Sequence, residues 1–268
     1  MSNTAFSFIG CGNMGGALAR AASLHDGNIS ILLANRSACK AEALAEELGA
    51  ASCSVAEAAE KGRFIFLGVK PQSMRELAGE IVPILRKRTD RFVLVSMAAG
   101  VTIERLRTLF NADYPVVRIC PNTPVSIGKG LVAWCAEGVT PAEMDELCCV
   151  MEGAGIWDEI SEGLMDTATV AGGCTPAFTY MFIEALADGA VRCGMPRKKA
   201  LFYAARAVEG AAALVMESGK HPGELKDAVC SPGGSTIVGV NTLEDHGFRA
   251  AAMDAVCAAA ECTSNMGK

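Results

Sequence analysis

The fold is decided at residues 5–15, where the sequence is Ala5-Phe6-Ser7-Phe8-Ile9-Gly10-Cys11-Gly12-Asn13-Met14-Gly15. The first five residues predict a buried strand, and an Ala- and Leu-rich pattern predicts a helix from Asn13 to Leu24. The G-x-G-x-x-G motif between them gives a tight turn, room for a pyrophosphate and close packing of helix on strand. This context predicts a dinucleotide-binding turn. Its expected residues are Ile9, Gly10, Cys11, Gly12, Asn13, Met14 and Gly15.

Strand and helix patterns alternate through the first part of the chain. After the first strand, further strands are expected at residues 29–34, 63–69, 92–95, 116–119, 131–135 and 156–160. Ser37 is expected to cap the helix that follows the second strand. Alternation of this kind predicts the α/β class, with a Rossmann-like doubly wound NAD(P)-binding domain.

The pattern changes near Ser161, after which no convincing strand remains. Helices are expected at residues 179–191, 198–217 and 248–262, and a further helix is expected to start at Pro222. In the last helix, Ala251 is expected to face inward. We therefore predict a dinucleotide-binding domain at residues 1–161 and an all-α substrate and dimerisation domain at 162–268. A small helical bundle of this kind is expected to bury its remaining apolar surface against a second subunit.

The end of the second predicted strand indicates which cofactor is bound. An NAD-binding chain normally has a carboxylate here, which holds the ribose 2′-hydroxyl. This chain instead has Asn35, Arg36 and Ser37, a set of donors suited to a 2′-phosphate. The sequence therefore favours NADP (as NADPH) over NAD, without excluding NAD.

Ligands of such folds lie at the carboxyl ends of the strands. The residues expected near the nicotinamide are Val69, Lys70, Pro71, Met97, Ala98, Pro121 and Asn122. The Pro121–Pro124 turn is explained equally well as a purely structural turn. In the helical part, Ser231-Pro232-Gly233-Gly234-Ser235-Thr236 leads into a helix expected at residues 237–243. Its amides and hydroxyls suit a small carboxylate, although a simple turn and N-cap remains an equal alternative.

Composition excludes several classes of function. The 268 residues are 51% hydrophobic and carry a formal charge of −6, which predicts a globular protein without a nucleic-acid surface. Three histidines, and twelve cysteines without C-x-x-C spacing, predict neither a metal site nor a disulfide framework. With no signal peptide expected ahead of the first apolar run, and no membrane span, the predicted location is the cytoplasm. Cys11 and Cys230 lie in the two ligand loops and are expected to react with thiol reagents.

Together these motifs resemble the pyrroline-5-carboxylate reductase family over nearly the whole chain. Besides the glycine turn, the resemblance rests on residues 69–72, 99–101, Arg118 with 121–124, and 184–190. Its most specific part is Leu225-Lys226-Asp227-x-Val229, followed by the Ser231–Thr236 loop and Leu243-Glu244. Two departures are Cys174-Thr175, where the family commonly has Ser-Gly, and Val55, where it often has Asn.

The resemblance implies NADPH-dependent reduction of (S)-1-pyrroline-5-carboxylate, a cyclic imine, to L-proline, the last step of proline biosynthesis. It implies a homodimer with a shared active site, often assembled into larger rings. Amides at Gly233, Gly234 and Ser235, with Ser231, would hold the substrate carboxylate, and Thr236 would act catalytically at the ring nitrogen. The alternatives are an NADP-dependent reductase of another cyclic imine or 2-oxo acid, and a non-catalytic dinucleotide-binding regulator.

Overall fold

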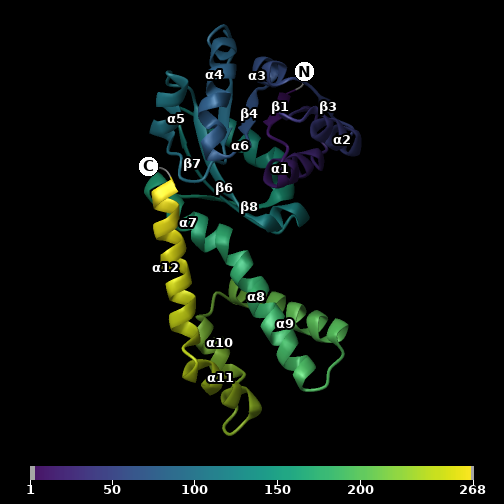
Figure 1. Cartoon of the computed structure of the whole chain (residues 1–268), viewed down its shortest axis with the longest axis vertical. Helices are drawn as coiled ribbons and strands as arrows, with labels where there is room; N and C mark the ends of the chain where they lie inside the picture. The colour runs from purple at the N-terminus through teal and green to yellow at the C-terminus, as the bar shows by residue number, and fades with distance from the viewer. Residues whose placement is uncertain (1–3, 267–268) are drawn as a thin grey trace. The chain divides into compact units, whose positions relative to one another are not determined.

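The protein was analysed as a computed structural model, which describes residues 4–266 (Figure 1). Its strands are β1 (Thr4–Ile9), β2 (Ile29–Ala34), β3 (Ala51–Ser52), β4 (Phe64–Leu67), β5 (Val93–Ser96), β6 (Val116–Pro121), β7 (Gly130–Glu137) and β8 (Gly155–Glu159). The helices that alternate with them are α1 (Asn13–Ser23), α2 (Ala38–Leu48), α3 (Val55–Lys61), α4 (Met74–Leu85), α5 (Ile103–Phe110) and α6 (Pro141–Val150). Next come α7 (Met165–Ala168), the π-helical turn η5 (Thr169–Cys174), α8 (Thr175–Arg192), α9 (Arg197–Ser218), α10 (Pro222–Ala228), α11 (Ser235–Asp245) and α12 (Phe248–Met266).

The described residues form two compact units, one of residues 4–174 with 259–266 and one of residues 175–258. The first unit contains a sheet of eight strands in the order β3-β2-β1-β4-β5-β6-β7-β8. Strands β1 to β6 are parallel, β7 runs antiparallel to β6, and β8 is parallel to β7. The predicted domain boundary at residue 161 marks the end of the strand pattern, whereas the compact units divide after residue 174. The boundary at 161 therefore stays a prediction.

Side chains on the two faces of the sheet belong to separate cores, since successive strand residues point to opposite faces. Phe64 and Phe66 pack with α1, α2 and α6, whereas Ile65 and Leu67 pack with α3, α4 and α5. Helices therefore cover both faces, and the predicted doubly wound α/β fold is confirmed.

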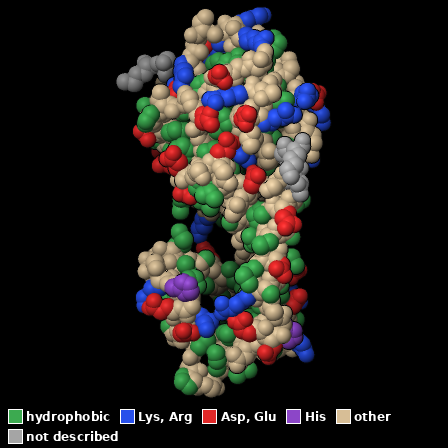
Figure 2. Space-filling view, turned by 90° about the vertical axis from the view of Figure 1, so that its left-hand side faces the viewer, with side chains coloured by type: hydrophobic (Ala, Val, Ile, Leu, Met, Phe, Trp, Pro, Cys, Tyr) green, Lys and Arg blue, Asp and Glu red, His purple; other side chains and the backbone are tan. Residues whose placement is uncertain are grey.

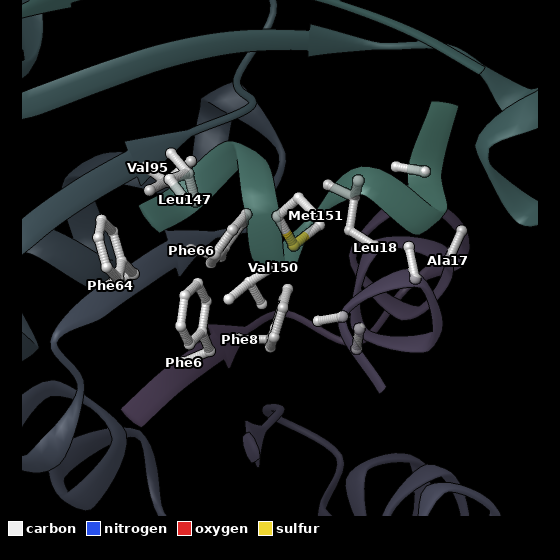
Figure 3. Packing of buried hydrophobic residues seen from close by; sticks show 14 of the residues in the cluster. Phe6, Phe8, Ala17, Leu18, Phe64, Phe66, Val95, Leu147, Val150 and Met151 are labelled. Carbon is white, nitrogen blue, oxygen red and sulfur yellow. The ribbon is translucent and has the colours of Figure 1, made fainter. Parts of the chain in front are cut away.

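The first of these cores is organised by aromatic pairs across β1 and β4 (Figure 3). Phe6 lies opposite Phe64 and Phe8 opposite Phe66, with ring centroids 4.8 Å and 4.4 Å apart. All four rings are essentially inaccessible to solvent. Stacked pairs of this kind stabilise adjacent strands beyond the burial of their area. They hold together the two strands whose carboxyl ends form the cofactor turn.

Three details differ from the sequence-based expectation. Strand β3 was missed because it has only two residues, too few for a periodic signal. Ser37 is the N-cap of α2, but its side chain makes no capping hydrogen bond. Helix α8 begins at Thr175, earlier than predicted, because it continues directly from α7 and η5 without a break.

The second unit consists of helices with little core of its own. Its cluster of buried side chains contains only Ala187, Ala200 and Ala204. Large exposed apolar side chains include Tyr180, Met181, Leu201, Phe202, Tyr203, Leu214, Met216, Val238 and Met253, and green side chains lie between charged ones on the face in Figure 2. Ala251 is exposed, contrary to prediction, because a helix face is buried only where another element covers it.

Candidate active site

The turn after β1 has the geometry that its glycines predicted. Gly10 adopts a φ of 105°, and a Cβ on it would lie 2.5 Å from the carbonyl oxygen of Gly68. A Cβ on Gly15 would lie 2.1 Å from the carbonyl oxygen of Gly10. Neither position can therefore carry a side chain without moving backbone. Gly68 directly follows β4 and is equally constrained, a role that local sequence reasoning missed because its cause is the Gly10 carbonyl oxygen after β1.

Gly12 is constrained by nothing in the protein. No described atom lies within 4 Å of the place where its Cβ would stand. The α1 helix begins immediately after it, with no capping side chain and no acidic residue in its first turn. The first-turn amides of a helix have no intrahelical acceptors, and they favour an anion. This open position beside uncapped amides fits the pyrophosphate of a dinucleotide.

The predicted ribose loop lies beside this turn. The amide of Cys11 donates to Asn35 Oδ1 at 3.1 Å, and Asn35 Nδ2 donates to the Ser37 carbonyl oxygen at 3.2 Å. Asn35 thus ties the two loops together with its side chain, while Arg36 and Ser37 remain exposed to solvent. An exposed guanidinium at the end of β2 suits a 2′-phosphate.

A pocket of about 380 Å³ lies at the carboxyl ends of β4, β5 and β6. Seven of the predicted cofactor residues line it together: Met14, Val69, Lys70, Pro71, Met97, Ala98 and Pro121. They come from four separate stretches of sequence that the parallel sheet brings to one edge. The mainly apolar lining suits a flat ring such as nicotinamide.

Asn122 is also predicted at this site, but its side chain already forms hydrogen bonds within the protein. Its Nδ2 donates to the Gly172 carbonyl oxygen at 3.1 Å, and its Oδ1 accepts from the Leu131 amide at 2.9 Å. It therefore links the end of β6 to β7 and to the π-helical turn η5. We expect its influence on the pocket to be positional rather than through a side-chain contact with the cofactor.

Arg118 lines the pocket but is not among the predicted site residues. Its guanidinium is buried and donates to Glu162 Oε1 at 3.2 Å and to Asp166 Oδ1 at 2.9 Å. Glu162 also accepts a hydrogen bond from the Ile103 amide. A single arginine inside the apolar run of β6 is visible in the sequence as an unusual residue. The carboxylates that it binds could not be identified, because they lie more than 40 residues further along the chain. The network fixes the chain after β8 against the pocket.

The predicted carboxylate loop lies in the second unit. Gly233 has a φ of 69°, the Gly234 amide donates to the Ser231 carbonyl oxygen, and Gly234 is the N-cap of α11. The helix begins at Ser235 rather than at the predicted residue 237, so Ser235 and Thr236 lie in its first turn and are exposed. That turn contains no acidic residue and no side-chain cap. Its amides and hydroxyls are suited to a small carboxylate.

Residues 4–266 contain no group of three or more His, Cys, Asp or Glu side chains placed to hold a metal ion. None of the helices in this range is long and apolar enough to cross a bilayer.

Comparisons with known proteins agree with this arrangement. Residues 162–266 match the family described as pyrroline-5-carboxylate reductase dimerisation, and residues 5–100 match NADP oxidoreductase coenzyme F420-dependent. The chain is 39% identical to a pyrroline-5-carboxylate reductase of Escherichia coli (strain K12), over 97% of each chain. It is 42% identical to pyrroline-5-carboxylate reductase 3 of Danio rerio, over 76% of this chain and 70% of that one.

Solved structures show the same similarity over the whole fold. A Plasmodium falciparum pyrroline carboxylate reductase with NADP bound is 30% identical and superimposes with a TM-score of 0.88, covering all of both chains. A pyrroline-5-carboxylate reductase from Coxiella burnetii is 25% identical, with a TM-score of 0.89 and the same coverage.

Proposed function

Since this chain belongs to the pyrroline-5-carboxylate reductase family, we propose that it reduces (S)-1-pyrroline-5-carboxylate to L-proline with NADPH through the residues described above. One observation carries the assignment of the site. The apolar pocket lies beside the glycine turn, where there is open space at Gly12 and the first amides of α1 have no capping side chain. The reductase of another imine or 2-oxo acid and the non-catalytic regulator are not favoured, because its relatives across nearly its full length are pyrroline-5-carboxylate reductases.

The first unit would hold the cofactor. The α1 amides after Gly12 would bind the pyrophosphate, and Arg36 with Asn35 and Ser37 would bind the 2′-phosphate. Met97, Ala98 and Pro121 would shield the nicotinamide from water in the pocket. NADPH, when bound, supplies the hydride.

The second unit would hold the substrate. The amides of Gly233, Gly234 and Ser235, with the Ser231 hydroxyl, would bind the carboxylate without any arginine. Thr236 Oγ1 would donate a hydrogen bond to the ring nitrogen of the neutral imine, or accept one from the N–H of the protonated form, and so orient the C=N bond. Protonation of the nitrogen, by the substrate's own proton or by water, makes its carbon electrophilic. The protein therefore contributes mainly position and desolvation.

Thr236→Ala tests this assignment. Loss of one hydrogen bond to the reacting ring should lower kcat/KM by about 10- to 100-fold, with NADPH affinity and circular dichroism unchanged. Thr236→Ser should restore most of the activity. Thr242→Ala is the matched control, since Thr242 lies in the same helix and only bonds the Val238 carbonyl oxygen. Unchanged kinetics of Thr236→Ala would remove Thr236 from the mechanism.

The reaction itself is tested by following oxidation of NADPH, and in parallel NADH, with pyrroline-5-carboxylate and with related 2-oxo acids. Turnover confined to a 2-oxo acid would contradict the proposed substrate. The assembly of dimers into a larger ring is a further part of the proposal, and light scattering of the purified protein tests it. The cytoplasmic location stays a prediction that cell fractionation can check.

A further inference from the structure

Two thiols line the same pocket. Cys120 lies on β6 and Cys174 is the last residue of the π-helical turn η5, and both are half-buried side chains of the pocket wall. Both belong to the first compact unit, so the spacing between them is a property of that unit alone. The proposed hydride transfer uses neither of them.

The contacts of Cys120 place it against the turn that carries Cys174. Cys120 Sγ donates to Thr169 Oγ1 at 3.2 Å, and Thr169 is the first residue of η5. A Cβ on Gly173, the residue next to Cys174, would lie 3.9 Å from Cys120 Sγ. Burial raises the pKa of the Cys120 thiol, and the hydrogen bond with Thr169 opposes this shift in part.

The backbone between these contacts can adapt. A π-helical turn is wider than an α-helical one and is less regularly packed. Gly172 and Gly173 precede Cys174 and put no side chain between it and β6. A small rotation of this turn is enough to change the distance between the sulfurs, and a disulfide needs Cβ atoms roughly 4 Å apart.

We propose that Cys120 and Cys174 form a covalent modification site, at which a low-molecular-weight disulfide such as glutathione disulfide oxidises them to an internal disulfide. Cys174 reacts first, because burial raises the pKa of the Cys120 thiol and Thr169 Oγ1 already contacts its sulfur. The Cys174 thiolate attacks one sulfur of glutathione disulfide, which breaks that S–S bond and releases a glutathione thiolate.

Cys120 then attacks the mixed disulfide on Cys174 and expels the second glutathione. Two protein thiols are oxidised and one glutathione disulfide is reduced to two glutathione thiols, which take up the two protons. The new bond ties η5 to β6 and changes the shape of this wall of the pocket. If the nicotinamide binds there, as proposed above, oxidation blocks its entry, and a dithiol reductant restores it.

Peptide mapping tests the bond without any assay of activity. After exposure to glutathione disulfide and alkylation of the remaining thiols, combined cleavage at Lys, Arg and Glu releases residues 119–129 and 163–184. Each of these peptides contains a single cysteine, Cys120 or Cys174. We expect the two peptides joined by a disulfide, and separate again after dithiothreitol. A glutathione adduct on Cys174 alone, or two unmodified peptides, would overturn the proposal.

Titration of the full-length protein with NADPH tests whether oxidation blocks entry of the nicotinamide. The oxidised protein should bind NADPH more than about tenfold more weakly than the same protein after reduction. Cys174→Ser, compared with its own reduced form, should lose this difference, whereas Cys120→Ser should stop at the glutathione adduct on Cys174 and yield no joined peptide pair. Cys149→Ser, a change at an exposed cysteine outside the pocket, should keep the difference in affinity. A joined peptide pair with unchanged NADPH affinity would refute the closure of the pocket, whereas a reduced protein that fails to bind NADPH would refute the proposed function instead.

Discussion

Gly12 and Gly15 belong to one motif, yet the structure gives them different reasons to be glycine. Gly15 is required by the protein itself, because a Cβ would meet the Gly10 carbonyl oxygen at 2.1 Å. Gly12 has open space around it and a φ of −77°, which alanine adopts freely. No contact within the protein requires a glycine here, which is consistent with the proposed pyrophosphate site.

The pair therefore makes a matched prediction. Gly12→Ala should leave the melting temperature within about 2 °C of the wild type and weaken NADPH binding by at least about tenfold. Gly15→Ala should lower the melting temperature clearly, since backbone must shift to relieve the clash. Thermal denaturation and NADPH titration measure the two effects. Normal NADPH affinity in Gly12→Ala would contradict the placement of the pyrophosphate.

Arg36 is expected to distinguish the two nicotinamide cofactors. Arg36→Ala removes the charge proposed for the 2′-phosphate, so KM for NADPH should rise by about 10- to 100-fold while KM for NADH changes little. Steady-state kinetics with both cofactors measure the ratio. Arg105→Ala, at an exposed cation on α5, serves as control. Equal loss with NADPH and NADH would mean that Arg36 does not contact the 2′-phosphate.

Cys11 shows how a local expectation changes once its surroundings are known. Its position in the cofactor turn predicted reactivity toward thiol reagents. In the structure its side chain is buried, and burial raises its pKa to about 11. The thiolate is the reactive form, and very little of it exists near neutral pH. The structure therefore argues against Cys11 as the sensitive thiol.

At the scale of elements, Glu143 holds α6 to the amino ends of two strands. Its carboxylate accepts from Arg63 and Arg91, which precede β4 and β5, at 2.8–2.9 Å, and from the Thr140 amide at 2.8 Å. The guanidinium of Arg91, foremost, holds the pKa of the buried Glu143 carboxyl well below its usual range. The folded state therefore favours the ionised form of this carboxyl more strongly than the unfolded chain does.

The sign of the pH dependence follows from this lowered pKa. Stabilisation by Glu143 is fully present above the ordinary carboxyl pKa and is lost as pH falls through the acid range toward the folded value. Glu143→Gln should cost about 2 kcal/mol at pH 7, and the difference from the wild type should shrink below about pH 4. Urea denaturation at several pH values measures it. A difference that grows on acidification would contradict the assignment.

At the scale of the whole molecule, the second unit exposes more apolar surface than an isolated domain tolerates. Residues 162–266 match a dimerisation family, which supports self-association of the chain. Leu214→Asp on α9 should weaken self-association by at least about tenfold, because it places a charge where burial is expected. Leu24→Asp, at an exposed leucine of the first unit, is the control. Light scattering at micromolar concentration compares them, and unchanged mass in Leu214→Asp would exclude that part of α9 from the interface.

Local sequence patterns were sufficient for features whose physical cause is local. The alternation of strand and helix follows from the period of apolar residues, and the cofactor turn follows from glycines and a helix start within a few residues of one another. The absence of a carboxylate after β2 likewise indicated NADP. These are properties of contiguous segments, and the structure places the corresponding residues at one edge of the sheet as expected.

Only the tertiary structure decided which distant residues meet. The constraint on Gly68 exists because β4 lies against β1, and the buried Arg118 finds its carboxylates only where the chain returns after β8. Cys120 and Cys174 come to one pocket wall for the same reason. Contacts across dozens of residues depend on the register and order of strands, which no local period encodes. The sequence thus determined the elements and the class of cofactor, and the packing of those elements determined what surrounds it.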